Sequence, residues 1–287
     1  MVVDLVAVIT AAVITGIVSV ALNLMMSVAR FINIGAGAIM AVGAYTTYLL
    51  TSISQLGFLT TAGLVFLTSS VIGLVFYLGV NKMGLFDQPE HTIEDLSAIL
   101  SYGFYLFITG GLSLLFGARY TSVNVKLELP LSLSFIKETE LTILIFALLV
   151  ASVMHLVFIS NNNLGLKSKA IIQNIQASIA IGINTKRIFA IVFMLSFGVL
   201  GLSGCLYVLL YPINPYFGLY YTVLGFVAAG VSGVGNLLYS FVIASVISIL
   251  YSFLGLVIPL GVAIAISYVL MLLILVAKPE GLKRGLR

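Results

Sequence analysis

The chain has 287 residues, of which 61% are hydrophobic and only 8% are charged, and its mean hydropathy is +1.24. A soluble domain needs more charge than this at its surface, so the composition excludes one and predicts an integral membrane protein with several crossings. The net charge of +4 does not indicate nucleic-acid binding, because the cations lie at loop ends rather than in one stripe.

The first part of the chain is expected to cross the membrane five times. Residues 5–29 form an apolar stretch about as long as a full crossing, too long for a signal-peptide core, so we interpret it as a retained helix. The run 31–81 carries no charge and holds two crossings at ~20 residues each. Two further crossings are expected at about residues 96–118 and 141–160.

The second part holds the longest uncharged run. Between Ile188 and Ala277 there is no Asp, Glu, Lys, Arg or His, which leaves room for about four crossings at ~20 residues each. Its weakest segment, about residues 217–234, is short and glycine-rich and is expected to be broken or re-entrant. The sequence thus predicts an all-α polytopic bundle of about 8–9 transmembrane helices in a single domain over residues 1–287.

The distribution of cations predicts an N-terminus outside and a C-terminus in the cytoplasm, because Lys and Arg accumulate in cytoplasmic loops. The cations expected inside are Lys82, Lys167, Lys169, Lys186, Arg187, Lys278, Lys283, Arg284 and Arg287. The longest outer loop is expected at about 119–140. Arg30 has apolar residues on both sides and is expected to extend to the membrane interface.

Five tyrosines gather near a predicted outer boundary. They are Tyr207, Tyr211, Tyr216, Tyr220 and Tyr221. Since the chain has no Trp, we interpret these rings as interfacial anchors rather than as a ligand cage. Cys205, the only cysteine, is interpreted as a small buried hydrophobe.

The residues needed for several chemistries are missing. No Asp or Glu lies within a predicted crossing, and His155 alone is not interpreted as a proton relay. No Gly-Lys-Ser/Thr, HExxH, nucleophile elbow or Cys/His cluster occurs. We therefore expect no catalytic residue, metal ligand or cofactor, and a separate subunit as the energy source for uphill transport. Sodium coupling through backbone carbonyls of broken helices remains open.

The polar block at about 161–187 is the one substantial loop between crossings five and six. Within it, residues 170–184 are predicted to form a short amphipathic helix, because isoleucines recur at helical spacing and Gly182 resembles a C-cap glycine. The isoleucines of this face are Ile171, Ile172, Ile175 and Ile179. Such a helix either lies on anionic lipid or docks into a groove of a cytosolic partner.

This loop resembles the cytoplasmic loop of permease subunits of branched-chain amino acid ABC importers, the LivH/LivM type. The matching residues are Ala177, Gly182, Ile183 and Asn184, and Gln176 stands where a Glu is usual. The resemblance implies that the loop contacts an ATPase subunit. The Gln keeps the polar reach of that position but loses the charge a salt bridge would need. The candidate coupling residues are Gln173, Gln176, Ala177, Gly182, Ile183 and Asn184.

Three further segments resemble the same family, in the same order along the chain. Residues 22–45 share Asn23, Asn33, Gly37, Gly43, Ala44 and Tyr45 with the family, whereas Ala36 and Ala38 replace its His and Glu. Residues 224–236 and 277–282 are similar to its small-residue and C-terminal patterns. The two alanines remove polar groups near the pathway that the resemblance implies, so they weaken an assignment to leucine.

Glycines in two places indicate close helix packing. The two sets are Gly35, Gly37 and Gly43, and Gly198, Gly201 and Gly204. The interrupted segments 33–37 and 230–235 also point to a pathway in which unwound backbone meets a solute. Asn23 and Asn33 should face the protein interior, where they either bond helices together or contact the solute. The candidate pathway residues are Asn23, Asn33, Gly35, Gly37, Gly230 and Gly233.

The resemblance implies a multi-pass permease subunit in the cell membrane of a prokaryote. Its partners would be cytoplasmic ATP-binding subunits, a second permease that is homologous or identical, and an extracytoplasmic solute-binding protein. The loops 119–140 and 211–221 are candidate docking surfaces for that binding protein. The alternatives are a permease for ribose-type sugars or nucleosides, a stand-alone ion-coupled secondary transporter or channel, and a structural scaffold without flux.

Overall fold

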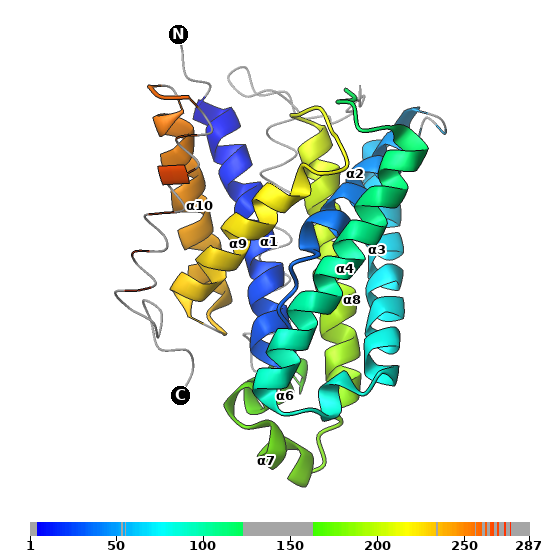
Figure 1. The fold of residues 1–287 in the computed structure, drawn as a ribbon, viewed down its shortest axis with the longest axis vertical. Coiled ribbons are helices and arrows are strands. Elements are labelled where there is room, and N and C mark those ends of the chain that lie inside the picture. Colours follow the sequence, from blue (N-terminus) through cyan, green and yellow to red (C-terminus); the bar gives the residue numbers. More distant parts are fainter. Residues whose placement is uncertain are drawn as a thin grey trace.

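A computed structural model describes residues 5–122 and 163–259, without residues 53, 55, 234 and 256, and scattered positions between 262 and 276. These parts are helical (Figure 1), apart from one isolated bridge between Thr121 and Ile213. The elements are α1 (Leu5–Ala29), α2 (Ala36–Ser52), α3 (Phe58–Lys82), η1 (Leu85–Asp87), α4 (Glu90–Phe116), α6 (Asn163–Gln173), α7 (Ile175–Ala180), α8 (Thr185–Val208), α9 (Gly218–Ser232) and α10 (Leu237–Leu254).

The predicted membrane bundle is confirmed in these parts. By length and composition, α1, α3, α4, α8 and α10 could each cross a membrane. The helix α9 is shorter, as the glycine-rich sequence indicates, and α2 has 17 residues. The crossing expected at 141–160, with His155, and most of the last crossing lie outside the described residues.

The helix α4 begins at Glu90, earlier than the boundary predicted at residue 96. Pro89 precedes it in an extended conformation, and Glu90 interacts favourably with the positive end of the helix dipole. Glu94 and Asp95 follow in the first turns and are exposed. These charged residues before residue 96 are part of the helix, which begins ahead of the apolar region.

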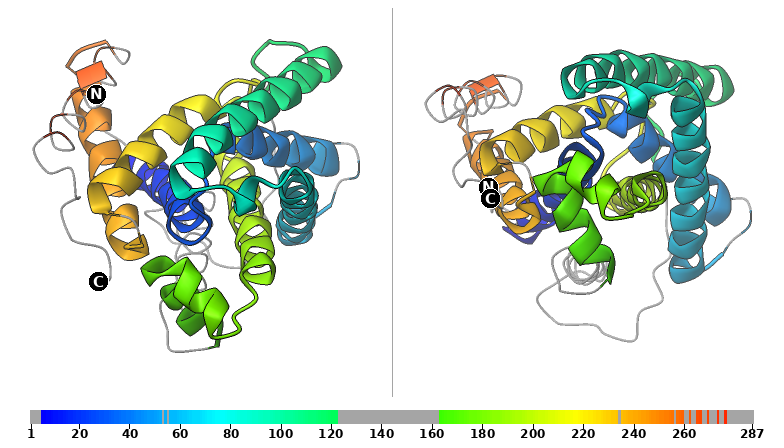
Figure 2. Two further views of the ribbon diagram at one scale, coloured as in Figure 1. Left: turned by 60° about the horizontal axis from the view of Figure 1, so that its bottom comes forward. Right: turned by 90° about the horizontal axis from the view of Figure 1, so that it is seen from below.

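The helices α1 and α8 form the centre of the bundle. Most residues of each are buried, whereas a third or fewer are buried in the apolar parts of α3, α4 and α10. The helix α1 packs against α8, α9 and α10, and α8 packs against α2 and α3. Figure 2 shows the same arrangement from other directions, with α3 and α4 at one side and α10 at the opposite side.

The predicted glycine packing is confirmed along α8. A Cβ on Gly201 would collide with Ser69 of α3, and one on Gly204 would collide with the carbonyl of Met40 in α2. Gly43 of α2 lies directly against the backbone of Gly201. These small residues let α2 and α3 approach α8 closely. Cys205 of α8 is also buried, as expected.

The elements predicted to be cytoplasmic share one end of the bundle. Figure 1 shows α6, α7 and the α3–α4 turn at the bottom, and the start of α1, the end of α4 and the loop after α8 at the top. At the top, the N–H groups of Thr121 and Ile213 each donate to the other residue's carbonyl at 2.9 Å. The beginnings of the two predicted outer docking loops therefore lie side by side.

The tyrosines expected to anchor the outer interface pack largely against other aromatic rings. Tyr221 is buried, and Tyr207 stacks on Phe217 with ring centroids 4.2 Å apart. Tyr220 meets Tyr251 of α10 edge to face. These rings pack against one another because the loop after α8 folds back over the bundle, and Tyr216 is the exposed member of the predicted set.

Candidate functional site

The first interruption is the stretch of residues 30–35 between α1 and α2. Its backbone bonds to α4: the Ile32 N–H donates to Ser97 Oγ at 2.9 Å and the Ile34 N–H donates to Ser101 Oγ at 3.0 Å. Ser101 Oγ in turn donates to the Ile32 carbonyl at 3.1 Å. Unwound backbone in a membrane protein must find such partners, and two buried serines one helical turn apart provide them.

These two serines were missed by the sequence analysis. Their signal was present, because Ser97 and Ser101 stand at i and i+4 in an otherwise apolar stretch. Two serines at this spacing do not by themselves indicate which groups they bond. Only the fold shows that the partner is the backbone of Ile32 and Ile34.

The second interruption lies between α9 and α10, where Gly233 and Gly235 have φ of 85° and 92°. Asn23 of α1 reaches it from the side. Its Nδ2 donates to Ser232 Oγ at 3.0 Å and to the Gly233 carbonyl at 3.2 Å, while its Oδ1 accepts from the Gly235 N–H at 2.9 Å. One buried side chain therefore bonds to the last residue of α9 and to two residues of the interruption.

The structure brings the candidate pathway residues together in two groups, one at each interruption. Asn23 lies with Gly233 at the second interruption, and Gly230 precedes them in the last turn of α9. Asn33 belongs to the first interruption and contacts Met25 of α1, with its Nδ2 3.4 Å from Met25 Sδ.

The two glycines that follow Asn33 fit against neighbouring backbone. A Cβ on Gly35 would meet the carbonyl of Ser101, and one on Gly37 would meet the backbone of Gly218 at the start of α9. Asn23 and Asn33 are both buried, as expected.

The predicted single helix over 170–184 is wrong in one respect, because the structure divides the segment at Asn174. The helix α6 ends at Gln173 and α7 begins at Ile175. Asn174 is the N-cap of α7, and its Oδ1 accepts from the Ala177 N–H at 3.0 Å. An Asn side chain that bonds nearby backbone favours such a cap over a helix interior.

The predicted role of Gly182 as a terminating glycine is confirmed. Its φ is +85°, its N–H donates to the Ile179 carbonyl at 2.9 Å, and the Ile183 N–H donates to the Ser178 carbonyl at 3.0 Å. This is the Schellman pattern of a helix end. Asn184 then caps α8, accepting from the Arg187 N–H at 3.0 Å. Two candidate coupling residues thus hold the shape of the loop.

The α6–α7 segment presents a partly apolar tip to the outside of the bundle. Ile171 is buried and Ile172 and Ile175 are half-buried, but Ile179 is 50% exposed and Ile181 is 74% exposed. The spacing placed these isoleucines on one face, whereas the structure puts Ile179 on the exposed side of the segment, away from the buried Ile171. Five of the six candidate coupling residues are also exposed, namely Gln173, Gln176, Ala177, Gly182 and Asn184.

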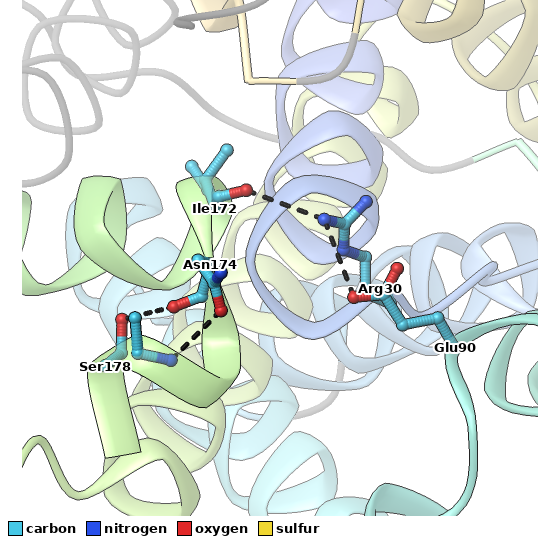
Figure 3. A network of polar contacts seen from close by, with 6 residues as sticks. Arg30, Glu90, Ile172, Asn174 and Ser178 are labelled. Carbon is cyan, nitrogen blue, oxygen red and sulfur yellow. Dashed lines mark hydrogen bonds and ion pairs between the residues drawn. The ribbon is translucent and has the colours of Figure 1, made fainter. Parts of the chain in front are cut away.

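Polar contacts hold this segment against the end of the bundle where the α3–α4 turn lies. Arg30 Nη2 donates to the Ile172 carbonyl at 3.5 Å and lies 4.0 Å from Glu90 Oε1, as Figure 3 shows. Arg30 thus points between α6 and α4, which corrects the expectation that it extends to the lipid interface. Lys186 makes a second ion pair with Asp87 at 3.6 Å.

Comparison with known proteins gives one family. The model of a family described as the permease component of branched-chain amino acid transport systems matches residues 5–277. The high-affinity branched-chain amino acid transport system permease proteins LivH of Escherichia coli K12 and Salmonella typhimurium are each 20% identical over 278 residues. The alignment covers 93% of this chain and 90% of each relative. No solved structure matches.

Proposed function

The chain belongs to the family of permease components of branched-chain amino acid transport systems, and on this premise we propose that it forms the translocation pathway of an ATP-driven importer in a prokaryotic cell membrane. It is a transport subunit without a catalytic role. The solutes proposed are branched-chain or related amino acids, in keeping with the names of its relatives.

The observation that carries the proposal is the α6–α7 segment. It protrudes at the end where the cations gather, its shape is fixed by two Asn caps and one glycine turn, and its tip exposes Ile179 and Ile181. A rigid, partly apolar projection fits a groove on a cytosolic partner. The partner proposed is the ATP-binding subunit, which would supply the energy that this chain has no residues to release.

The two interruptions support the translocation role. Irregular backbone is tolerated at membrane depth only where protein or a cavity surrounds it, and transporters use such broken helices to contact solutes. We place the pathway beside Asn23, Asn33, Gly35, Gly37, Gly230 and Gly233. Their apolar surroundings suit the brief passage of an apolar zwitterion. A second permease chain, like or unlike, would complete the pathway.

The outer end would receive an extracytoplasmic binding protein. The bridge between Thr121 and Ile213 holds the starts of the two candidate docking loops together. Ser113 near the end of α4 also bonds to the Tyr216 hydroxyl at 3.0 Å. The loops would therefore present one joint surface to the partner.

The experiment is a mild-detergent pull-down of the tagged chain from its native membrane, comparing wild type with Gly182→Asp. A charged side chain at this turn faces the partner, so a P-loop ATPase should co-purify with wild type and be lost from the variant. The matched control is Gly84→Asp, which also has positive φ and open space around it, at the neighbouring α3–α4 turn.

Three outcomes separate the alternatives. Loss of the ATPase from Gly182→Asp but not from Gly84→Asp supports the importer and the docking role together. Retention in both variants removes the loop from the mechanism. If the wild-type chain purifies alone, the ABC assignment fails, and ion-driven flux in proteoliposomes then tests for a secondary transporter. Competition by ribose or nucleosides against leucine tests the other solute classes.

A further inference from the structure

One residue of the cytoplasmic segment lies beside both interruptions. The backbone carbonyl of Ile172 accepts the 3.5 Å hydrogen bond from Arg30, the residue with which the first interruption begins. The side chain of the same residue faces the second interruption across the space that the missing side chain of Gly235 leaves, because a Cβ on Gly235 would be 3.7 Å from Ile172 Cγ2. We propose that Arg30 and Ile172 are positioning residues that transmit movement of the α6–α7 segment to both interruptions. This inference rests on the proposed importer function.

Arg30 connects the α6–α7 segment to the first interruption. Its φ is 54°, and among the described residues it alone combines a side chain with a positive φ. Such a backbone conformation persists only where the surroundings hold it. Here the guanidinium lies between the Ile172 carbonyl and the Glu90 carboxylate of α4 (Figure 3). The same helix α4 carries Ser97 and Ser101, which bond the rest of the interruption.

Ile172 connects the α6–α7 segment to the second interruption. It is half-buried and packs against the core, so it cannot move far unless the residues around it move as well. Its neighbour Gly235 has φ of +92° and a backbone N–H bonded to Asn23. Because glycine has no side chain, no flexible group of Gly235 stands between Ile172 and the backbone of the interruption.

The segment itself is built to carry a displacement from its tip to Ile172. Although α6 and α7 are separate helices, the Asn174 N–H donates to the Ala170 carbonyl at 3.0 Å and so continues α6. The Ser178 hydroxyl donates to the Asn174 carbonyl at 2.8 Å and so belongs to α7 (Figure 3). Asn174 is thus bonded into both helices, and force applied at Ile179 reaches Ile172.

The test measures hydrogen exchange of the purified permease–ATPase complex in nanodiscs, with and without ATP plus vanadate. In wild type the nucleotide should change exchange in α6–α7 and in both interruptions, residues 30–35 and 233–236. Arg30→Asn removes the long cationic side chain but keeps a residue that tolerates positive φ. It should reduce the nucleotide-dependent change in exchange at residues 30–35 about fivefold, as expected for loss of one hydrogen bond. The change at residues 233–236 should stay as in wild type.

Ile172→Ala should give the converse result. It keeps the carbonyl that Arg30 binds and removes the side chain over Gly235, so the response of 233–236 should fall while that of 30–35 remains. Arg30→Lys keeps the charge and should restore most of the response lost in Arg30→Asn. The control Lys82→Asn removes an exposed cytoplasmic cation at the end of α3 and should respond as wild type.

The outcomes distinguish this inference from the function on which it rests. If wild type carries no ATPase, the proposed function fails and the inference falls with it. If nucleotide changes exchange in α6–α7 but both interruptions respond in the variants as in wild type, the importer stands and the inference is overturned. The inference is also overturned if either variant loses the nucleotide-dependent change in exchange equally at both interruptions. Such a result would mean that the substitution destabilises the region as a whole, rather than one of two separate connections.

Discussion

The Gly235 N–H donates a 2.9 Å hydrogen bond to Asn23 Oδ1, although 212 residues separate the two in sequence. Asn23 also donates to the Gly233 carbonyl, so a single side chain of α1 replaces the helical bonds that the interruption loses. In the first interruption, serines of α4 do the same for Ile32 and Ile34. Both interruptions are therefore specific, hydrogen-bonded structures held from a neighbouring helix.

Asn23→Ala should destabilise the protein. The substitution leaves the buried Gly235 N–H and Gly233 carbonyl without their partner, which costs roughly 1–3 kcal/mol for each unsatisfied group. The measurement is thermal unfolding in detergent. The control is Ser27→Ala, because Ser27 is equally buried but its hydroxyl donates at 3.2 Å to Leu24 within its own helix. Equal loss of stability in the two variants would contradict the cross-helix role of Asn23.

Ser101→Ala should loosen the first interruption more than Ser97→Ala does. Ser101 Oγ both accepts from the Ile34 N–H and donates to the Ile32 carbonyl, whereas Ser97 Oγ accepts from Ile32 alone among these groups. Hydrogen exchange of the Ile32 and Ile34 amides measures the effect. Thr109→Val is the control, since Thr109 is buried in α4 and donates at 2.7 Å to Tyr105 of the same helix. Unchanged protection in both serine variants would show that α4 does not hold this backbone.

The sequence predicted those features that depend on local chemistry. Gly182 was identified as a helix end because only a residue tolerant of positive φ fits there. The small-residue face of α8 was predictable because large side chains keep membrane helices apart. The burial of Asn23 and Asn33 was predictable because a polar side chain in a membrane costs free energy unless it is hydrogen-bonded.

Features that depend on distant partners were not predictable in the same way. Arg30 was misjudged because its partners lie on other helices. Asn174 was misjudged although its partner, the Ala177 N–H, is local, because the isoleucines around it favoured one continuous helix. The N-cap bond of Asn174 forms only once α7 turns away from α6. Arg30 finds Ile172 and Glu90 only in the assembled bundle.

Gly43→Ala should destabilise the crossing of α2 and α8. A Cβ at this position would overlap the backbone of Gly201, and the two helices would have to separate, at a cost of about 1–3 kcal/mol. Gly103→Ala in α4 is the matched control, because nothing lies within 4 Å of its added Cβ. Thermal unfolding should show a loss for Gly43→Ala and none for Gly103→Ala. A stable Gly43→Ala variant would mean that the two helices can move apart freely.

Gln176→Glu should strengthen docking of the proposed ATPase subunit. Gln176 is exposed on α7 at the position where the resemblance expects a carboxylate, so the substitution restores the charge for an ion pair. Exposed pairs contribute about 0.2–1 kcal/mol and weaken with salt, so the gain should be a few-fold in affinity at low ionic strength and vanish at high ionic strength. Titration of the ATPase subunit onto nanodisc-held permease measures it. Gln88→Glu, exposed in the α3–α4 turn, is the control for a general charge effect at this end. If the two variants gain equally, the position on α7 has no specific partner.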